Sequence, residues 1–379
     1  MARCSTCFPV LLSTLLSTVL LVSCGYGDVS GSGSSSGAAG APESAGAAGS
    51  TGSSVPGDPS GVGPRPTAEV FSEAVVSTEL PAGESRDSGF TEHVVYPVRG
   101  GVADPSQNWA DFYLPPGRHD EDSVPLVVFI HGGAWRSGAT GARRIARDLT
   151  SRGVAVLNVE YRAVDRGGGW PVTFSDVADA LDYVPELDRR HPEITVDDET
   201  VVGHSAGAQL AAWAGTRGDL EKGEIGADPR FTPTRVVSLS GPLDMRWSAE
   251  HGDDNVVRVL GGSPSQVPDR YAAVDPIQNI NPRIPVVAVH GTDDSVVPVD
   301  DSRRYVSRLS AEGGRAKLVL LTGEDHVSYL KRSSPRYDRV LDIIHGVSTL
   351  SPEDLGRRLD GGTAHVAQGS ASVTASPGA

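Results

Sequence analysis

The chain has 379 residues, and 33 Lys and Arg stand against 48 Asp and Glu, so the formal net charge is −15. This acidic balance argues against nucleic acid as a partner, because phosphate binding requires a basic surface. It also argues against electrostatic docking on an anionic bilayer. The hydrophobic fraction of 38% is low for a globular chain, which indicates that part of the length lies outside a folded core.

Residues 1–23 have the composition of a secretory signal peptide. Arg3 is their only charged side chain, and residues 8–22 form an apolar run that is too short to span a bilayer core comfortably. The run ends in Leu-Val-Ser-Cys, which resembles the lipoprotein box of bacteria. That resemblance implies cleavage before Cys24 and attachment of lipid to its thiol. An ordinary signal peptide with an incidental cysteine is the alternative.

The other two cysteines, Cys4 and Cys7, lie inside the segment that would be removed. The mature chain would then have no free thiol and no disulfide, and its fold would depend on its core alone. These features predict an extracytoplasmic protein that is attached to the bacterial cell membrane through an N-terminal lipid.

Both ends of the remaining chain are rich in small residues. Residues 24–87 hold Cys24 followed by a Gly/Ser/Ala-rich stretch, which cannot bury enough apolar surface to offset its ordering entropy and is predicted to be a flexible tether. Residues 351–379 are predicted to be a disordered tail. The segment between them, residues 88–350, has the size of one domain, and residues 242–284 within it form a possible short cap.

Short apolar runs alternate with amphipathic stretches through this domain. Strands are expected at residues 92–96, 109–114, 125–130, 154–161, 200–204, 235–240, 285–290 and 317–321. Helices are expected at residues 141–151, 174–190, 205–215, 302–311 and 337–346. The middle strands are almost continuously aliphatic, which is typical of strands buried on both faces. The pattern predicts an α/β fold with an eight-stranded, mostly parallel sheet, helices on both faces and an antiparallel first pair of strands at one edge.

Ser205 is the candidate nucleophile. It lies in Gly-His-Ser-Ala-Gly at a strand-to-helix boundary, the pattern of a nucleophile elbow. Glycine at positions 203 and 207 avoids a clash between strand and helix, and the Ala206 N–H at the start of the helix faces charge developing on a substrate oxygen. The same pattern at residues 33–37 has no strand before it and no helix after it.

A second motif, His-Gly-Gly-Ala-Trp at residues 131–135, directly follows a predicted strand. It resembles the oxyanion loop of α/β-hydrolases, and this resemblance makes the backbone N–H groups of Gly133, Ala134 and Ala206 the candidate oxyanion donors. His131 is expected to support the loop by hydrogen bonding. Trp135 is a weak candidate for the substrate pocket, with packing inside the loop as the alternative.

The remaining catalytic candidates lie downstream. Asp294 precedes Ser-Val-Val-Pro, where the family pattern places an acid, and its register favours it over Asp293. His326 follows the last predicted strand. The three candidates occur in the chain order Ser205, Asp294, His326. In a triad of these residues, the histidine would accept the serine proton and the aspartate would fix the tautomer of the histidine. The histidines at positions 204 and 290 are expected to be structural.

Together these motifs resemble the α/β-hydrolase superfamily over residues 88–349, in particular its carboxylesterase and kynurenine-formamidase-like branch with an HGG-W loop. The segments Val-Glu-Tyr-Arg at 159–162 and Trp-Pro at 170–171 with Asp176 support this. The resemblance implies a serine hydrolase that cleaves a small or medium carboxylic ester through an acyl-enzyme, without metal or cofactor. Trp247, in the possible cap, is a weak pocket candidate. An amidase, peptidase or arylformamidase with the same triad remains an alternative, as does a non-catalytic binding lipoprotein.

Overall fold

A computed structural model describes residues 75–76, 90–99, 101–196 and 199–360. The predicted signal peptide, Cys24, most of the predicted tether and residues 361–379 lie outside the described residues. None of the helices in the described ranges is long and apolar enough to cross a membrane.

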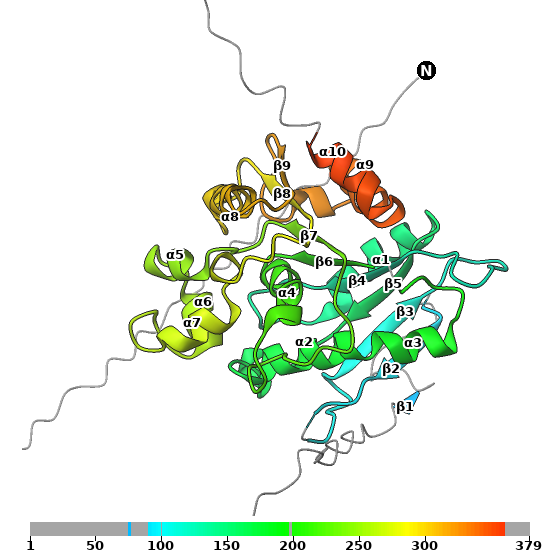
Figure 1. The fold of residues 1–379 in the computed structure, drawn as a ribbon, viewed down its shortest axis with the longest axis horizontal. Coiled ribbons are helices and arrows are strands. Elements are labelled where there is room, and N and C mark those ends of the chain that lie inside the picture. Colours follow the sequence, from blue (N-terminus) through cyan, green and yellow to red (C-terminus); the bar gives the residue numbers. More distant parts are fainter. Residues whose placement is uncertain (1–74, 77–89, 100, 197–198, 361–379) are drawn as a thin grey trace, which may run out of the picture. The chain divides into compact units, whose positions relative to one another are not determined.

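The described part of the chain is built on one nine-stranded sheet (Figure 1). Its spatial order is β1-β2-β3-β5-β4-β6-β7-β8-β9. The three pairs β1-β2, β2-β3 and β3-β5 are antiparallel. The remaining pairs in this order, starting with β5-β4 and ending with β8-β9, are parallel. The strands are β1 (Val75–Val76), β2 (Glu92–Val95), β3 (Trp109–Tyr113), β4 (Leu126–Ile130), β5 (Ala155–Val159), β6 (Thr200–His204), β7 (Arg235–Leu239), β8 (Val286–Gly291) and β9 (Ala316–Leu321).

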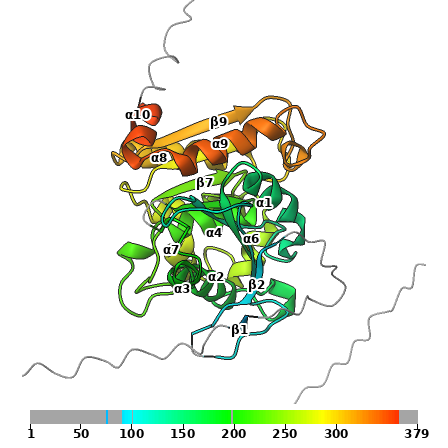
Figure 2. The same ribbon diagram turned by 90° about the vertical axis from the view of Figure 1, so that its right-hand side faces the viewer.

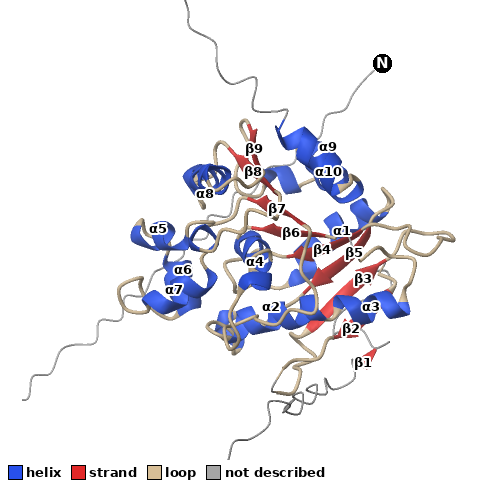
Figure 3. Cartoon of the chain, viewed as in Figure 1, coloured by secondary structure: helices blue, strands red, loops and turns tan. Residues whose placement is uncertain are grey.

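Helices cover both faces of the sheet (Figures 2 and 3). One face packs against α2 (Val172–Asp182), α3 (Val184–Arg190), α4 (Ala206–Ala214) and α8 (Val299–Ala311), and the other against α1 (Arg143–Thr150), α9 (Tyr337–Thr349) and α10 (Pro352–Asp360). In β4, Val128 packs in the core on the α4 side of the sheet, whereas its neighbours Val127 and Phe129 pack in the core on the α1 side. Because successive side chains of a strand point to opposite faces, both faces must be apolar, which explains the continuous aliphatic runs. The predicted α/β-hydrolase fold is confirmed.

Three details differ from the sequence prediction. Strand β1 lies inside the range assigned to the tether and adds a ninth strand by pairing Val75 with Val95 of β2. The helix expected at residues 174–190 is two helices, α2 and α3, because Pro185 at the start of α3 has no N–H to continue the preceding helix. The tail prediction is wrong for residues 352–360. They form α10, whose Leu355 and Leu359 are one turn apart and are buried against the sheet.

Residues 242–284, the possible cap, follow β7 and form three short helices (Figure 1). These are α5 (Met245–Glu250), α6 (Asp254–Leu260) and α7 (Pro268–Val274). Their buried residues join the core on the α4 side of the sheet. A backbone hydrogen bond of 2.8 Å from the Trp170 N–H to the Val259 carbonyl ties α6 to the loop after β5.

Candidate active site

Ser205 lies at the sharp turn between β6 and α4, with φ 54° and ψ −122°. This left-handed conformation is costly for a residue with a side chain, and such strain is typical of functional positions. The two glycines of the motif allow the turn. A Cβ on Gly203 would collide with the carbonyl of Gly207, and one on Gly207 would collide with the carbonyl of Ile130 in β4. The sequence therefore forms this turn only with glycine on both sides of the serine.

The structure brings Ser205, His326 and Asp294 into one hydrogen-bonded chain. The Nε2 atom of His326 lies 2.8 Å from the Ser205 Oγ, and its Nδ1 atom lies 2.8 Å from the Asp294 Oδ2. The three residues follow β6, β9 and β8, and the carboxyl ends of parallel strands share one edge of the sheet. The carboxylate is fully buried, whereas Ser205 and His326 each keep 8% of their surface exposed.

Both carboxylate oxygens of Asp294 have hydrogen-bond partners. Its Oδ1 accepts the backbone N–H groups of Val296 and Val297 at 2.9 and 3.0 Å, and its Oδ2 also lies 3.2 Å from the Nε2 of His290. Burial alone would raise the pKa of Asp294. Hydrogen bonds from His290, His326 and the Val297 N–H outweigh this and hold that pKa well below its ordinary value. The group opposite His326 is therefore a carboxylate.

Two other histidines support this arrangement, as expected. His290 is fully buried, and its Nδ1 lies 2.8 Å from the Ser302 hydroxyl. His204 directs its Nε2 at the carbonyl oxygen of His326, 2.9 Å away. Burial, and then the nearby His326, lower the pKa of His204 to about 4, so this ring is neutral at neutral pH and its Nε2–H donates to that carbonyl. His204 therefore holds the loop that carries His326.

The loop after β4 has an unusual backbone beside Ser205. Gly133 has φ 107°, and the next two residues, Ala134 and Trp135, both have φ 55°. Two successive non-glycine residues in this region are strained. Among the described residues, the N–H groups of Gly133, Ala134 and Ala206 donate no hydrogen bond. Gly133 and Ala134 line the same pocket as Ser205.

The buried carboxylate of Glu160, which was not among the predicted site residues, supports the loop. Its Oε1 lies 3.1 Å from the Nε2 of His131, and its Oε2 accepts the Ala139 N–H at 2.7 Å. The His131 Nδ1 lies 2.8 Å from the Gly132 carbonyl, and its ring stacks on Tyr161 with centroids 4.3 Å apart. The predicted supporting role of His131 is confirmed. The sequence did contain a signal for the role of Glu160: it is a charged residue at the end of an apolar strand, and a carboxylate buried there requires hydrogen-bond partners.

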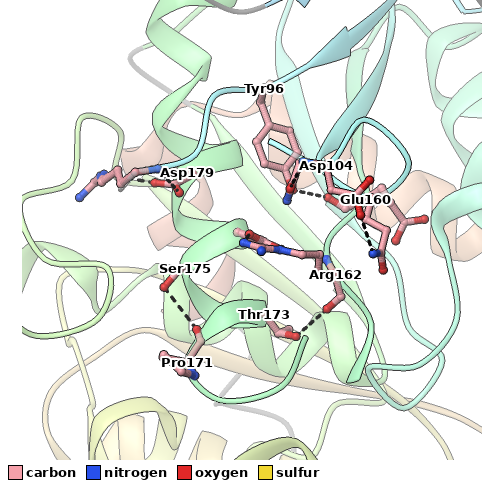
Figure 4. Close-up of polar contacts among 12 residues, drawn as sticks. Tyr96, Asp104, Glu160, Arg162, Pro171, Thr173, Ser175 and Asp179 are labelled. Carbon is pink, nitrogen blue, oxygen red and sulfur yellow. Dashed lines mark hydrogen bonds and ion pairs between the residues drawn. The ribbon is translucent and has the colours of Figure 1, made fainter. Parts of the chain in front are cut away.

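The segment around Glu160 is fixed in turn by a polar network (Figure 4). The Tyr96 hydroxyl donates to the Glu160 carbonyl at 2.6 Å. Arg162 donates from Nε and Nη2 to the two oxygens of Asp176 in α2 at 2.8 and 2.6 Å, and the Thr173 hydroxyl donates to the Arg162 carbonyl at 2.7 Å. The Val-Glu-Tyr-Arg segment and Asp176 thus hold the loop after β5 on α2.

A pocket of about 530 Å³ opens over Ser205. It is lined by Gly133, Ala134, Arg136, Ser137, Asp165, His204, Ser205, Val296, His326 and Val327. Neither tryptophan proposed for it belongs to the lining. Trp135 is 1% exposed and packs in the core on the α4 side of the sheet. Trp247 in α5 instead stacks on His251, with centroids 4.2 Å apart.

Three comparisons with known proteins bear on this site. The BD-FAE family matches residues 110–309, more than half of the chain. A probable isoprenylcysteine alpha-carbonyl methylesterase ICME of Oryza sativa subsp. japonica is 28% identical over 265 residues, which are 64% of this chain and 62% of that protein. Kynurenine formamidase of Drosophila melanogaster is 26% identical over 219 residues, covering 56% of this chain and 69% of that protein.

Among solved structures, the propionate-bound esterase Est2 of Thermogutta terrifontis superposes with a TM-score of 0.52 at 23% identity. That match covers 62% of this chain and 86% of Est2 and shows a shared fold. The chain spans about three fifths of the length of the methylesterase relatives that it matches. It belongs to the BD-FAE family, and its fold is that of the α/β-hydrolases.

Proposed function

We propose that this protein is a serine hydrolase that cleaves a carboxylic ester through an acyl-enzyme. The observation that carries the proposal is the chain of two 2.8 Å contacts from Ser205 through His326 to Asp294 at the base of an open pocket. A serine hydroxyl within reach of an imidazole that is oriented by a carboxylate is the arrangement that activates serine as a nucleophile.

In the first half-reaction, the Ser205 Oγ attacks the carbonyl carbon of the ester while its proton passes to the Nε2 of His326. The carbonyl oxygen becomes an oxyanion that faces the N–H groups of Gly133, Ala134 and Ala206. Collapse of this intermediate breaks the bond to the alcohol oxygen, which takes the proton from His326. The alcohol leaves, and the acyl group stays on Ser205.

In the second half-reaction, His326 takes a proton from a water molecule as the water attacks the acyl-enzyme. The oxyanion forms again at the same N–H groups. The bond to the Ser205 Oγ then breaks, and that oxygen recovers its proton from His326. The carboxylic acid leaves, and no metal or cofactor takes part in the proposed cycle.

Arylformamide hydrolysis is the second candidate, because a relative matching 56% of this chain is named kynurenine formamidase. The same triad would serve an amide. The name of a methylesterase relative and that of the esterase with the same fold favour an ester as the substrate. Peptide hydrolysis and non-catalytic ligand binding on this scaffold are the other outcomes of the tests.

A panel of esters graded by acyl length, with one arylformamide and one anilide, tests the proposal. We expect the esters to be hydrolysed fastest and Ser205→Ala to lower kcat by more than about 10³-fold. Ser265→Ala, an exposed serine between α6 and α7, is the matched control and should keep full activity. Equal turnover by the wild type and Ser205→Ala would contradict the proposal, and faster turnover of the arylformamide would select the second candidate.

We also propose that Cys24 carries lipid and holds the enzyme on the outer side of the bacterial cell membrane. The support is the sequence around Cys24 and the apolar run before it. We expect Cys24→Ser to move the protein from the membrane fraction to the soluble fraction. Membrane association that is equally firm in this variant would refute the anchor.

A further inference from the structure

Exposed apolar side chains gather at the candidate active site. Among the described residues, the exposed large hydrophobic side chains are those of Val102, Val296, Leu320 and Val327. Two of these, Val296 at 60% and Val327 at 41% exposure, line the pocket over Ser205. Single exposed hydrophobic residues are ordinary, but a pair beside a reactive serine indicates contact with an apolar ligand group.

Both valines belong to the loops that hold the catalytic candidates. Val296 follows Asp294 by two residues, and its N–H donates to the Asp294 Oδ1 at 2.9 Å. Val327 directly follows His326. The positions of the two side chains are therefore tied to the loops that position the imidazole. We call the surface formed by Val296, His326 and Val327 the histidine wall.

Another part of the pocket lining has a different character. It is formed by Arg136, Ser137 and Asp165, which we call the loop wall. The Arg136 Nε lies 2.6 Å from the Asp165 Oδ2, and Arg258 of α6 lies 3.7 Å from the other oxygen of Asp165. An apolar chain placed against these charges would remove water from them without replacing its hydrogen bonds, which is unfavourable.

The direction of proton transfer decides which part of an ester meets which wall. His326 must return its proton to the alcohol oxygen, so that oxygen has to lie within about 3 Å of the Nε2 atom. The carbonyl oxygen points away from it, toward the N–H groups of Gly133 and Ala134. The carbon chain attached to the alcohol oxygen therefore starts beside the histidine wall, and the acyl group is left with the rest of the lining, which includes the loop wall.

We infer that the substrate is an ester of an apolar alcohol and that Val296 and Val327 bind this alcohol. The inference rests on the proposed function and adds a substrate class to it. The polar loop wall accommodates a short or polar acyl group. The two valines determine specificity by contact with the leaving group and take no part in proton transfer.

The test compares acetate esters of ethanol, butanol and hexanol, whose alcohols differ little in acidity, with acid release measured at constant pH. We expect kcat/KM to rise by about two- to threefold per added methylene, less than the roughly fourfold of complete burial because the pocket is open. Lengthening the acyl group from ethyl acetate to ethyl hexanoate should raise kcat/KM by a smaller factor.

The variant Val296→Ser/Val327→Ser should reduce the rise along the alcohol series to less than about 1.5-fold per methylene. Val102→Ser removes an equally apolar residue, 91% exposed and outside the pocket, and should keep the wild-type rise. The thermal midpoint of each variant checks that it is folded.

A flat alcohol series in a wild type that hydrolyses ethyl acetate through Ser205 would overturn the inference and leave the proposed function intact. A steep series that persists in the double variant, or a steeper acyl series, would also overturn it. If hydrolysis of every ester is the same in wild type and Ser205→Ala, the proposed function fails and the substrate assignment fails with it.

Discussion

The substitution Asp294→Asn tests the proposed role of Asp294 in orienting His326, because it removes the negative charge while keeping the shape of the side chain. The Oδ1 position accepts two backbone N–H groups at 2.9 and 3.0 Å, so the amide oxygen has to take it. The amide NH₂ then occupies the Oδ2 position, 2.8 Å from the Nδ1 of His326 and 3.2 Å from the Nε2 of His290. His326 can accept from that NH₂ only with its own proton on Nε2.

A histidine with its proton on Nε2 cannot take the proton of Ser205. We therefore expect kcat to fall by about 10⁴-fold, the size of effect that a wrong tautomer has in serine proteases. At 1.36 kcal/mol for each factor of ten, this corresponds to about 5.4 kcal/mol of transition-state stabilisation. The assay is steady-state hydrolysis of a single ester at neutral pH, with Ser205→Ala as the baseline.

The neighbouring residue Asp293 provides the control. It is exposed, and its Oδ1 accepts the Thr292 hydroxyl at 2.8 Å. We expect Asp293→Asn to change kcat by less than about twofold, as is usual for a surface substitution. If Asp294→Asn retains more than a tenth of the activity, or if Asp293→Asn loses as much, the assignment of the acid is refuted.

Three further substitutions test the supporting structure. Glu160→Gln removes the buried charge that accepts hydrogen bonds from His131 and Ala139. We therefore expect the free energy of unfolding to fall by about 1.5–3 kcal/mol, with a lower melting temperature and a lower kcat. A wild-type melting temperature together with a wild-type kcat would contradict this role. Gly207→Ala places a Cβ against the Ile130 carbonyl, so little folded protein should be recovered, and a wild-type melting temperature would refute the steric argument. Burial raises the pKa of Asp301 to about 7, so between about pH 4 and 7 the folded state binds more protons than the unfolded chain and stability falls as pH rises. Asp301→Asn should reduce this fall between pH 5 and pH 8 in thermal unfolding, and an unchanged pH dependence would contradict the linkage.

The motifs that predicted the fold and the candidate site are local. A turn such as the one at Ser205 depends on glycine two residues away on each side, so its geometry is present in a few consecutive letters. The aliphatic runs predicted the strands for a similar reason, since a strand buried on both faces is mostly apolar. Ser205, Asp294 and His326 could be related to one another because parallel strands end at one edge of the sheet.

Contacts between distant parts of the chain could not be predicted in this way. Glu160 is 29 residues from His131, and nothing in the spacing of the two indicates that they meet. The pocket lining comes from loops after β4, β5, β6, β8 and β9, so its apolar and charged walls appear only in the folded chain. For Trp135 the sequence left two alternatives open, the pocket lining and packing, and only the folded chain shows that its ring is buried in the core.

The tail was misjudged for a different reason. Composition averaged over residues 351–379 is dominated by small and polar residues, whereas Leu355 and Leu359 alone supply the apolar face that packs against the core. Two leucines one helical turn apart are enough when a neighbouring core is available to cover them, and an average over the whole segment conceals them.

The most direct test of the account is covalent labelling of the intact protein with a fluorophosphonate, followed by mass mapping of the adduct. The account predicts one adduct on the Ser205 Oγ, its loss in Ser205→Ala and much slower labelling in His326→Ala. The absence of an adduct on the wild type, or equal labelling of Ser205→Ala, would contradict the claim that Ser205 is an activated nucleophile.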